Sequence, residues 1–272
     1  MQTFNVNGAA LAGFEKGRGK TLILVHGAVG DWRSWEGVVD LLAPHYRVIN
    51  YSRRGHWPNA AYAPSEVYST EAHAEDLIAM IGLCGGGPVR LLGHSYGAGV
   101  CAAVAAEHPD LVRSQMLAEP SLFGMAKSHP LGAIAMAQTA AATMHVVPLL
   151  KKSQPEKALS DFLHAIIGKE DYARLSPAAL QVMSDNVSTL EPMLNGLVSV
   201  LSFTGKQAAR IACPTLLVEG EHTTALFRHT VKAMAKSIPN SERVVLPNVG
   251  HGLQLEDPAG FSRTALEFFA KH

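Results

Sequence analysis

The chain has 272 residues, of which 47% are hydrophobic, enough for one large domain with a sizeable core. This composition excludes a disordered or fibrous chain. Twenty-three Lys and Arg balance 23 Asp and Glu, so the formal net charge is zero and the pI is about 7.2. Such a balance gives no electrostatic signature for nucleic acid or for an anionic membrane. We therefore expect no nucleic-acid partner and no membrane partner, but a small neutral molecule as substrate.

The three cysteines, Cys84, Cys101 and Cys213, are odd in number and widely spaced. This spacing fits neither a disulfide framework nor a zinc site, and it favours a reducing compartment. The N-terminus lacks a basic start followed by an apolar run, and no window reaches 18 uncharged apolar residues. The sequence therefore predicts a cytoplasmic protein.

The first half of the chain alternates between strand and helix patterns. The unbroken apolar run Leu22–Val25 is typical of a central strand that is buried on both faces. Alternation of this kind predicts an α/β fold with a mostly parallel sheet and helices on both faces. The other predicted strands are Thr3–Val6, Ala9–Phe14, Tyr46–Tyr51, Val89–Leu92 and Val112–Ala118, and the predicted helices are Ser34–Leu42, Thr70–Leu83 and Ala98–Glu107.

A long segment from about Leu122 to Arg210 then lacks any strand signal and is rich in Ala, Leu and Met, which predicts helices throughout. The alternation resumes with strand Pro214–Val218, helix Phe227–Ser237, strand Arg243–Leu246 and a final helix capped by Asp257 with Pro258 in its first position. We therefore expect a core of residues 1–121 and 211–272. A helical cap of residues 122–210, inserted before the last two strands, is expected to lie over one edge of the sheet as a lid.

The most informative segment is Gly93-His94-Ser95-Tyr96-Gly97, which lies between the predicted strand Val89–Leu92 and an Ala-rich helix. This is the G-x-S-x-G pattern in a strand, turn and helix context. Small flanking residues let the backbone turn sharply there and leave the serine hydroxyl exposed. Because pattern and context agree, the segment predicts a nucleophilic serine.

With this motif the chain resembles the α/β-hydrolase superfamily over nearly its whole length. His26–Gly30 follow a buried strand as the oxyanion loop of that family does, and Tyr51–His56 are similar to its arginine-glycine turn. Gly250-His251-Gly252 resemble its histidine loop before the last helix. The resemblance implies an α/β-hydrolase fold, with Ser95 as nucleophile, His251 as general base, and neither metal nor cofactor.

A serine hydroxyl is a weak nucleophile at neutral pH, so it needs a base and donors that stabilise the oxyanion. The resemblance places these donors at the backbone N–H groups of Tyr96 and Ala28.

The third member of a catalytic triad is less evident from the sequence. In the common family pattern an aspartate follows the penultimate strand, but Thr223 holds that place here. Some family members instead have the acid after the preceding strand, and this chain resembles them in having Glu119 there. The sequence favours Glu119 as the acid and leaves Glu221 as the alternative.

Five of the nine methionines lie in the predicted cap: Met125, Met136, Met144, Met183 and Met193. We therefore expect flexible apolar side chains of the cap to cover the serine. The cap also lacks a basic cluster that would bind a phosphate or carboxylate. We expect Trp57, Phe123 and Met144 to contact the substrate.

These features predict a serine hydrolase that cleaves an ester or lactone of a small apolar or aromatic substrate through an acyl-enzyme. Carbon-carbon bond hydrolases and cofactor-free dioxygenases of the same superfamily remain alternatives. A receptor-like member that binds its ligand with little turnover is an alternative of another class. The sequence also leaves a homodimer open.

Overall fold

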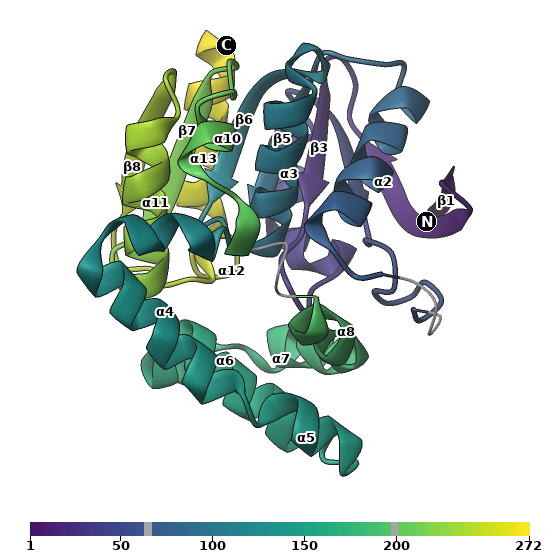
Figure 1. The fold of residues 1–272 in the computed structure, drawn as a ribbon. Helices are drawn as coiled ribbons and strands as arrows, with labels where there is room; N and C mark the ends of the chain where they lie inside the picture. Colours follow the sequence, from purple (N-terminus) through teal and green to yellow (C-terminus); the bar gives the residue numbers. More distant parts are fainter. Residues whose placement is uncertain (63–66, 197–200) are drawn as a thin grey trace.

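In the computed structural model, which describes residues 1–62, 67–196 and 201–272, one eight-stranded sheet forms the centre of the protein (Figure 1). The strand order is β1-β2-β4-β3-β5-β6-β7-β8. β2 is antiparallel to both of its neighbours, and the strands from β4 to β8 are parallel. The α/β-hydrolase fold with a mostly parallel sheet is thus confirmed. The strands are β1 (Gln2–Val6), β2 (Ala9–Lys16), β3 (Thr21–Val25), β4 (Arg47–Tyr51), β5 (Val89–His94), β6 (Val112–Ala118), β7 (Thr215–Gly220) and β8 (Ser241–Leu246).

Helices cover both faces of the sheet, and an apolar cluster lies under each layer. On one face Leu22 and Leu24 of β3 pack with α1 and α13, while Ile23 and Val25 belong to the cluster on the opposite face, with α2, α3 and α11. A strand buried on both sides needs apolar residues at every position, which explains the unbroken run in the sequence. The helices are α1 (Glu36–Leu42), α2 (Thr70–Leu83), α3 (Tyr96–Glu107), α10 (Gly205–Ala208), α11 (Ala225–Ser237), α12 (Leu253–Glu256) and α13 (Pro258–Lys271).

Most predicted elements are present, with shifted ends. β5 extends through Gly93 and His94 because β6 pairs with both residues, and α3 begins at Tyr96 rather than Ala98. The predicted N-cap residue of the last helix is also confirmed, since the Asp257 side chain accepts a hydrogen bond from the Gly260 N–H.

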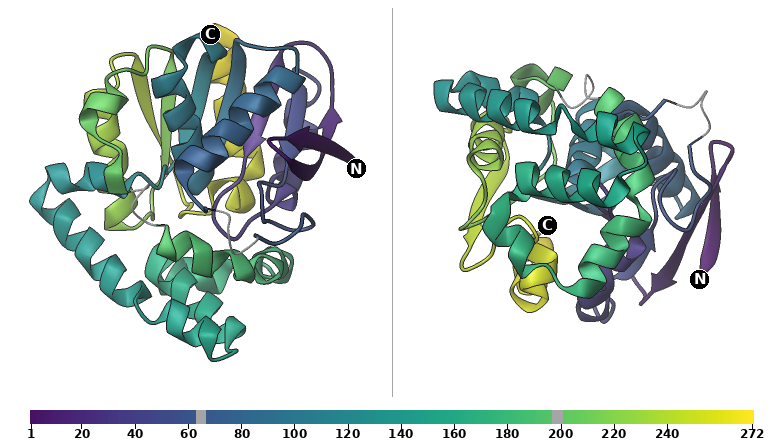
Figure 2. Two further views of the ribbon diagram at one scale, coloured as in Figure 1. Left: turned by 45° about the vertical axis from the view of Figure 1, so that its right-hand side comes forward. Right: turned by 90° about the horizontal axis from the view of Figure 1, so that it is seen from below.

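The described residues between 122 and 210 contain helices and no strand. α4, α5, α6, α7 and α8 lie together beside the sheet, below it in Figure 1, and Figure 2 shows them crossing its lower end. Residues 197–200 of the predicted cap lie outside the described residues. The helices are α4 (Pro130–Thr143), α5 (Val146–Lys151), α6 (Pro155–Arg174), α7 (Pro177–Asp185) and α8 (Leu190–Asn195).

One stretch of the cap, Pro130–Lys151, is long and apolar enough by composition to span a membrane, with a mean hydropathy of 1.4. One such stretch is weak evidence for a membrane span. Part of its apolar character has a local explanation, because one side of α4 faces the apolar cavity described below, through Met136, Ala140 and Thr143.

Candidate active site

Ser95 stands at a sharp turn between β5 and α3. Its backbone has φ 52° and ψ −117°, a conformation that a non-glycine residue adopts only when the surrounding structure fixes it, at a cost of about 1–3 kcal/mol. Two glycines permit the turn. A Cβ on Gly97 would overlap the carbonyl oxygen of Val25, and one on Gly93 would lie 2.6 Å from the Ala98 Cα. The turn therefore holds the hydroxyl at the carboxyl end of the parallel strands.

The hydroxyl of Ser95 faces the imidazole of His251 in the loop after β8. Ser95 Oγ lies 3.1 Å from His251 Nε2, which is within reach of proton transfer. The other ring nitrogen, Nδ1, lies 2.6 Å from Glu119 Oε2. All three side chains are buried. The structure thus brings together the serine, the histidine and the glutamate that the sequence favours, in the order of a nucleophile, a base and an orienting acid.

Glu119 follows β6 and is held by two further donors. Its Oε1 accepts the backbone N–H of Gly220 at 2.7 Å, and its Oε2 accepts the hydroxyl of Thr223 at 2.7 Å. Thr223, which replaces the usual aspartate, therefore supports the acid from the loop after the neighbouring strand β7. The alternative, Glu221, is exposed and accepts the backbone N–H of Asn248 instead of contacting His251.

Burial dominates the electrostatics of this group. Loss of hydration lowers the pKa of His251 to about 3, and Asp171 acts against this shift. Loss of hydration also pushes the pKa of Glu119 upward, and the hydrogen bonds from Gly220 and Thr223 act against this shift. The two groups share one hydrogen bond, so they titrate as a pair. The lowered pKa of His251 keeps its ring neutral. The neutral ring is the form that accepts a proton from a hydroxyl.

The two expected oxyanion residues, Ala28 and Tyr96, line the same cavity as Ser95. Tyr96 is the first residue of α3, where the backbone N–H has no partner within the helix and the helix dipole favours negative charge. Within the described residues, no acceptor pairs with the Ala28 N–H. Both N–H groups are therefore available to an oxyanion beside Ser95.

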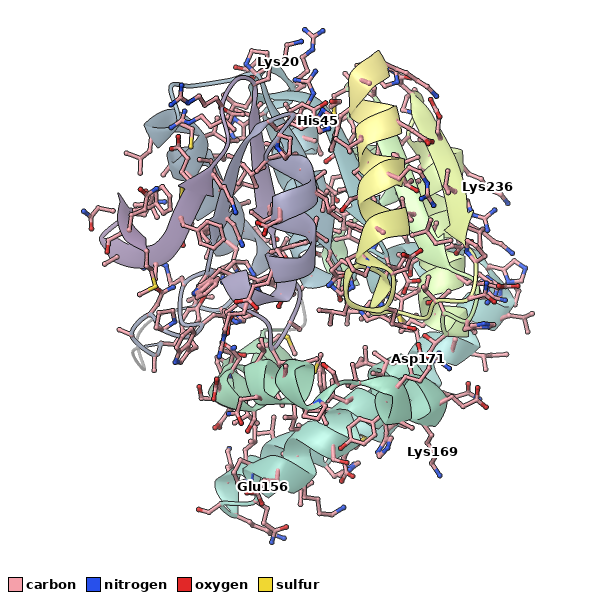
Figure 3. All side chains as sticks on the ribbon, turned by 180° about the vertical axis from the view of Figure 1, so that it is seen from behind. Lys20, His45, Glu156, Lys169, Asp171 and Lys236 are labelled. Atoms are coloured by element: carbon pink, nitrogen blue, oxygen red, sulfur yellow. The ribbon has the colours of Figure 1, made fainter. Side chains whose placement is uncertain are left out.

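Asp171, a residue that the sequence analysis did not single out, joins the cap to the histidine loop. Helix α6 breaks at Gly168, with φ 84°, and Asp171 follows on the side of the cap toward the core (Figure 3). Its Oδ2 accepts the backbone N–H of His251 at 3.0 Å, and it forms an ion pair with Arg174. A Cβ on Gly250 would overlap the carboxylate, which explains a glycine there.

Three further side chains contact the triad, and two of them, Ser121 and Phe227, escaped the sequence analysis. The hydroxyl of Ser121 lies 3.0 Å from Ser95 Oγ. The ring of Phe227 stacks on His251 with 4.1 Å between the centroids. His94 Nε2 lies 2.8 Å from the carbonyl oxygen of His251. Each of them restricts the position of the serine or the imidazole, and no local motif names the role of Ser121 or Phe227.

An apolar cavity of about 200 Å³ opens at Ser95 between the sheet and the cap. Among the described residues its lining contains no Asp, Glu, Lys or Arg. Three of the five cap methionines contribute to it: Met136, Met183 and Met193. Phe123, which we expect to contact the substrate, also lines it.

The other two expected substrate contacts lie outside this cavity. Met144, at the end of α4, is 77% exposed. The Trp57 ring is partly exposed and lies under the guanidinium of Arg33, at 3.8 Å. The predictions for Met144 and Trp57 are wrong, because enrichment of a residue type along the chain does not tell which way a side chain faces.

A second cavity, of about 240 Å³, meets the first at Ala28, His94 and His251. Its lining is more polar, and it includes four charged side chains: Arg33, Glu36, Asp171 and Glu256. His251 therefore stands between an apolar space under the cap and a polar space beside it. In the part of the chain that the structure describes, no group of three or more His, Cys, Asp or Glu is placed to hold a metal ion.

Comparisons with known proteins agree with this fold. The chain is 26% identical to epoxide hydrolase 3 of Xenopus tropicalis over 264 residues, which cover 92% of the chain and 71% of that protein. Several other curated relatives match over a third to a half of the chain, and the chain spans 16% to 48% of their length.

Solved structures match over almost the whole chain. An α/β hydrolase of Sphaerobacter thermophilus has a TM-score of 0.77 at 25% identity and covers 98% of this chain and 100% of its own. The enol-lactonase of Burkholderia xenovorans has a TM-score of 0.77 at 18% identity, with 98% and 99% covered. At that identity the second match shows the fold alone.

The family model described as alpha/beta hydrolase fold matches residues 20–258, which is most of the chain. This range includes the turn at Ser95, the acid at Glu119 and the loop of His251. The family and its named relatives support hydrolase activity. The chain belongs to the alpha/beta hydrolase fold family.

Proposed function

We propose that the protein is a serine hydrolase that cleaves an ester or lactone through an acyl-enzyme. The observation that carries this proposal is the hydrogen-bonded series from Ser95 Oγ to His251 Nε2, at 3.1 Å, and from His251 Nδ1 to Glu119, at 2.6 Å. This is the geometry in which a base removes the proton of an attacking hydroxyl while an acid fixes its tautomer.

In the first half of the reaction Ser95 Oγ attacks the substrate carbonyl carbon, and its proton passes to His251 Nε2. The carbonyl oxygen becomes an oxyanion, which the N–H groups of Ala28 and Tyr96 stabilise. Glu119 accepts the Nδ1 proton in a hydrogen bond and stabilises the imidazolium. The tetrahedral intermediate then collapses, the bond to the leaving alkoxide breaks, and His251 returns the proton to it.

In the second half a water molecule takes the place of the alcohol. His251 removes one proton from the water, and the resulting hydroxide attacks the acyl carbon bound to Ser95. Collapse of the second oxyanion breaks the bond to Ser95 Oγ, and His251 returns the proton to that oxygen. An ester or lactone suits this site because an alkoxide demands less acid assistance than an amine does.

The lining of the cavities supports a substrate with a small apolar or aromatic acyl group. A charged acyl group would lose its hydration in the apolar cavity and find no partner there. The polar cavity lies on the other side of His251 and includes Arg33 and Glu36. We place the alcohol of the ester on that side, where hydroxyl groups find hydrogen-bond partners.

The relationship to an epoxide hydrolase raises a second chemistry. Epoxide hydrolases of similar fold use an aspartate as nucleophile, whereas this chain has Ser95 at the corresponding turn. Attack of the Ser95 hydroxyl on an epoxide carbon would form an ether, which would not hydrolyse, whereas attack by an aspartate forms an ester, which does. The serine therefore favours acyl transfer over epoxide opening.

A burst experiment tests the proposal. With a p-nitrophenyl ester of a short acyl chain, we expect a rapid release of about one p-nitrophenol per protein, followed by slower turnover. Ser95→Ala should lose several orders of magnitude in kcat, while Ser121→Ala, which removes a neighbouring hydroxyl, serves as the matched control and should retain activity.

Other outcomes point to the alternatives. Full activity of Ser95→Ala, with oxygen consumed from a heteroaromatic substrate, would contradict the proposal in favour of a dioxygenase. A burst with turnover near one per molecule would contradict it in favour of a protein that chiefly binds its ligand.

A further inference from the structure

The peptide group between Gly27 and Ala28 is hydrogen bonded at one end and open at the other. Its carbonyl oxygen accepts a hydrogen bond from Arg53 Nη2 at 2.9 Å and lies 2.9 Å from His26 Nδ1. The Arg53 backbone N–H donates to His26 Nε2 at 2.9 Å, so the ring proton is on Nδ1, and the carbonyl accepts two hydrogen bonds. The N–H of the same peptide is that of Ala28, beside Ser95.

Arg53 is an unusual neighbour for that peptide because its guanidinium is buried, with 1% of the residue exposed. Its remaining contacts are neutral. Nε donates to the His26 carbonyl at 3.2 Å, and Nη1 donates to the Tyr68 hydroxyl at 3.2 Å and lies 3.4 Å from His73 Nε2. No carboxylate forms an ion pair with it in the described part of the chain.

The same guanidinium also reaches the second oxyanion residue. Its central carbon lies 4.6 Å from the ring centroid of Tyr96, a cation–π distance. One buried positive charge therefore contacts both segments from which the expected donors come. Burying a cation without an anionic partner costs several kcal/mol, as an order of magnitude, so a purely structural link between two loops would be expensive.

We propose that Arg53 is a positioning residue for the oxyanion site, which orients and polarises the Gly27–Ala28 peptide so that the Ala28 N–H donates more strongly. A charge-assisted hydrogen bond to a peptide carbonyl withdraws electron density from the N–H of that peptide, and hydrogen bonds in series strengthen one another in a low-dielectric interior. The inference rests on the proposed acyl-transfer function. It assigns to Arg53 a part of the stabilisation that Ala28 provides.

Arg53→Met tests the inference because methionine has a similar length and no charge. Arg54→Met is the matched control, since Arg54 forms its ion pair with Asp76 and does not contact the Gly27–Ala28 peptide. For a p-nitrophenyl ester we expect Arg53→Met to lower kcat by about 10- to 100-fold, less than the loss of a whole oxyanion donor, with KM nearly unchanged. Binding of a trifluoromethyl ketone, which forms an oxyanion on Ser95, should weaken by the same factor. The control should leave both values within about twofold.

A vibrational measurement separates polarisation from a merely structural role. In the acyl-enzyme formed from a carbonyl-¹³C ester, a strong oxyanion site lowers the stretching frequency of the ester carbonyl. We expect this frequency to rise in Arg53→Met and to stay at the wild-type value in Arg54→Met. A structural role would reduce the folded fraction without moving the frequency of the acyl-enzyme that still forms.

If Arg53→Met does not fold, His26→Leu tests the polarisation of the same peptide, because leucine has no N–H to donate to the Gly27 carbonyl. An unchanged carbonyl frequency in whichever variant folds would overturn the inference. The proposed function fails on a different result, namely a wild-type protein that gives no burst and no adduct on Ser95.

Discussion

The acid at Glu119 gives the sharpest prediction, because Glu119→Gln keeps the shape of the side chain and reverses one hydrogen bond. The Gly220 N–H fixes an acceptor at the position of Oε1, so the amide nitrogen takes the position of Oε2, 2.6 Å from His251 Nδ1. An amide can only donate there, which forces the ring proton onto Nε2. The imidazole then donates to Ser95 Oγ and cannot accept its proton.

We expect Glu119→Gln to lower kcat by about 10⁴, which corresponds to about 5.4 kcal/mol of transition-state stabilisation, as the wrong tautomer does in other triads. KM should change little. The assay is steady-state hydrolysis of a p-nitrophenyl ester, with Glu221→Gln as the control. Activity of Glu119→Gln within tenfold of wild type, or an equal loss in Glu221→Gln, would refute the reasoning.

Stability shows whether such a loss reflects unfolding. Burial raises the pKa of Glu119, so the folded state binds this proton more tightly than the unfolded state does. The contribution of this group to wild-type stability is complete below about pH 4.5 and is lost as pH rises through the folded-state pKa, whereas the neutral glutamine has no such dependence. The melting temperature of Glu119→Gln minus that of the wild type should therefore be more positive at pH 9 than at pH 4.

Three further predictions concern the surroundings of the triad. Asp171→Asn keeps an acceptor for the His251 N–H but removes a charge that raises the pKa of His251, so the acidic limb of kcat/KM should move to lower pH, and an upward shift would contradict this. Adding Thr223→Asp to Glu119→Ala places a carboxylate at the position of the Thr223 hydroxyl, which now donates to Glu119. The double variant should have a kcat at least about tenfold higher than Glu119→Ala alone. No gain in kcat would count against this position for the acid. Phe123→Ala should raise KM for esters with longer acyl chains while Met144→Ala leaves it unchanged, and equal effects would contradict the cavity assignment.

The sequence predicts the features whose signals are local. The turn at Ser95 is recognisable because a buried strand, two glycines and an Ala-rich helix are contiguous, and the final helix carries its own cap at Asp257. The end of β5 is harder to predict from the sequence. Gly93 and His94 count as strand because they pair with Leu117 and Ala118, which are distant in the sequence.

Contacts between distant segments account for what the sequence could not give. Asp171 meets the histidine loop only because α6 breaks at Gly168 and the cap folds back over the sheet. The support of Glu119 by Thr223 depends on β6 and β7 being neighbours. Met144 illustrates the opposite error, since the apolar composition of this segment does not reveal that Met144, directly after α4, faces solvent.

The most direct test of the central claim is to locate the adduct of a fluorophosphonate by mass spectrometry of the digested protein. If a hydroxyl at the turn after β5 is activated by the imidazole of His251, one adduct should form on the peptide that contains Ser95, and it should form far more slowly in His251→Ala. A folded protein that gives no adduct, or an adduct on another residue at an equal rate in both proteins, would contradict the account.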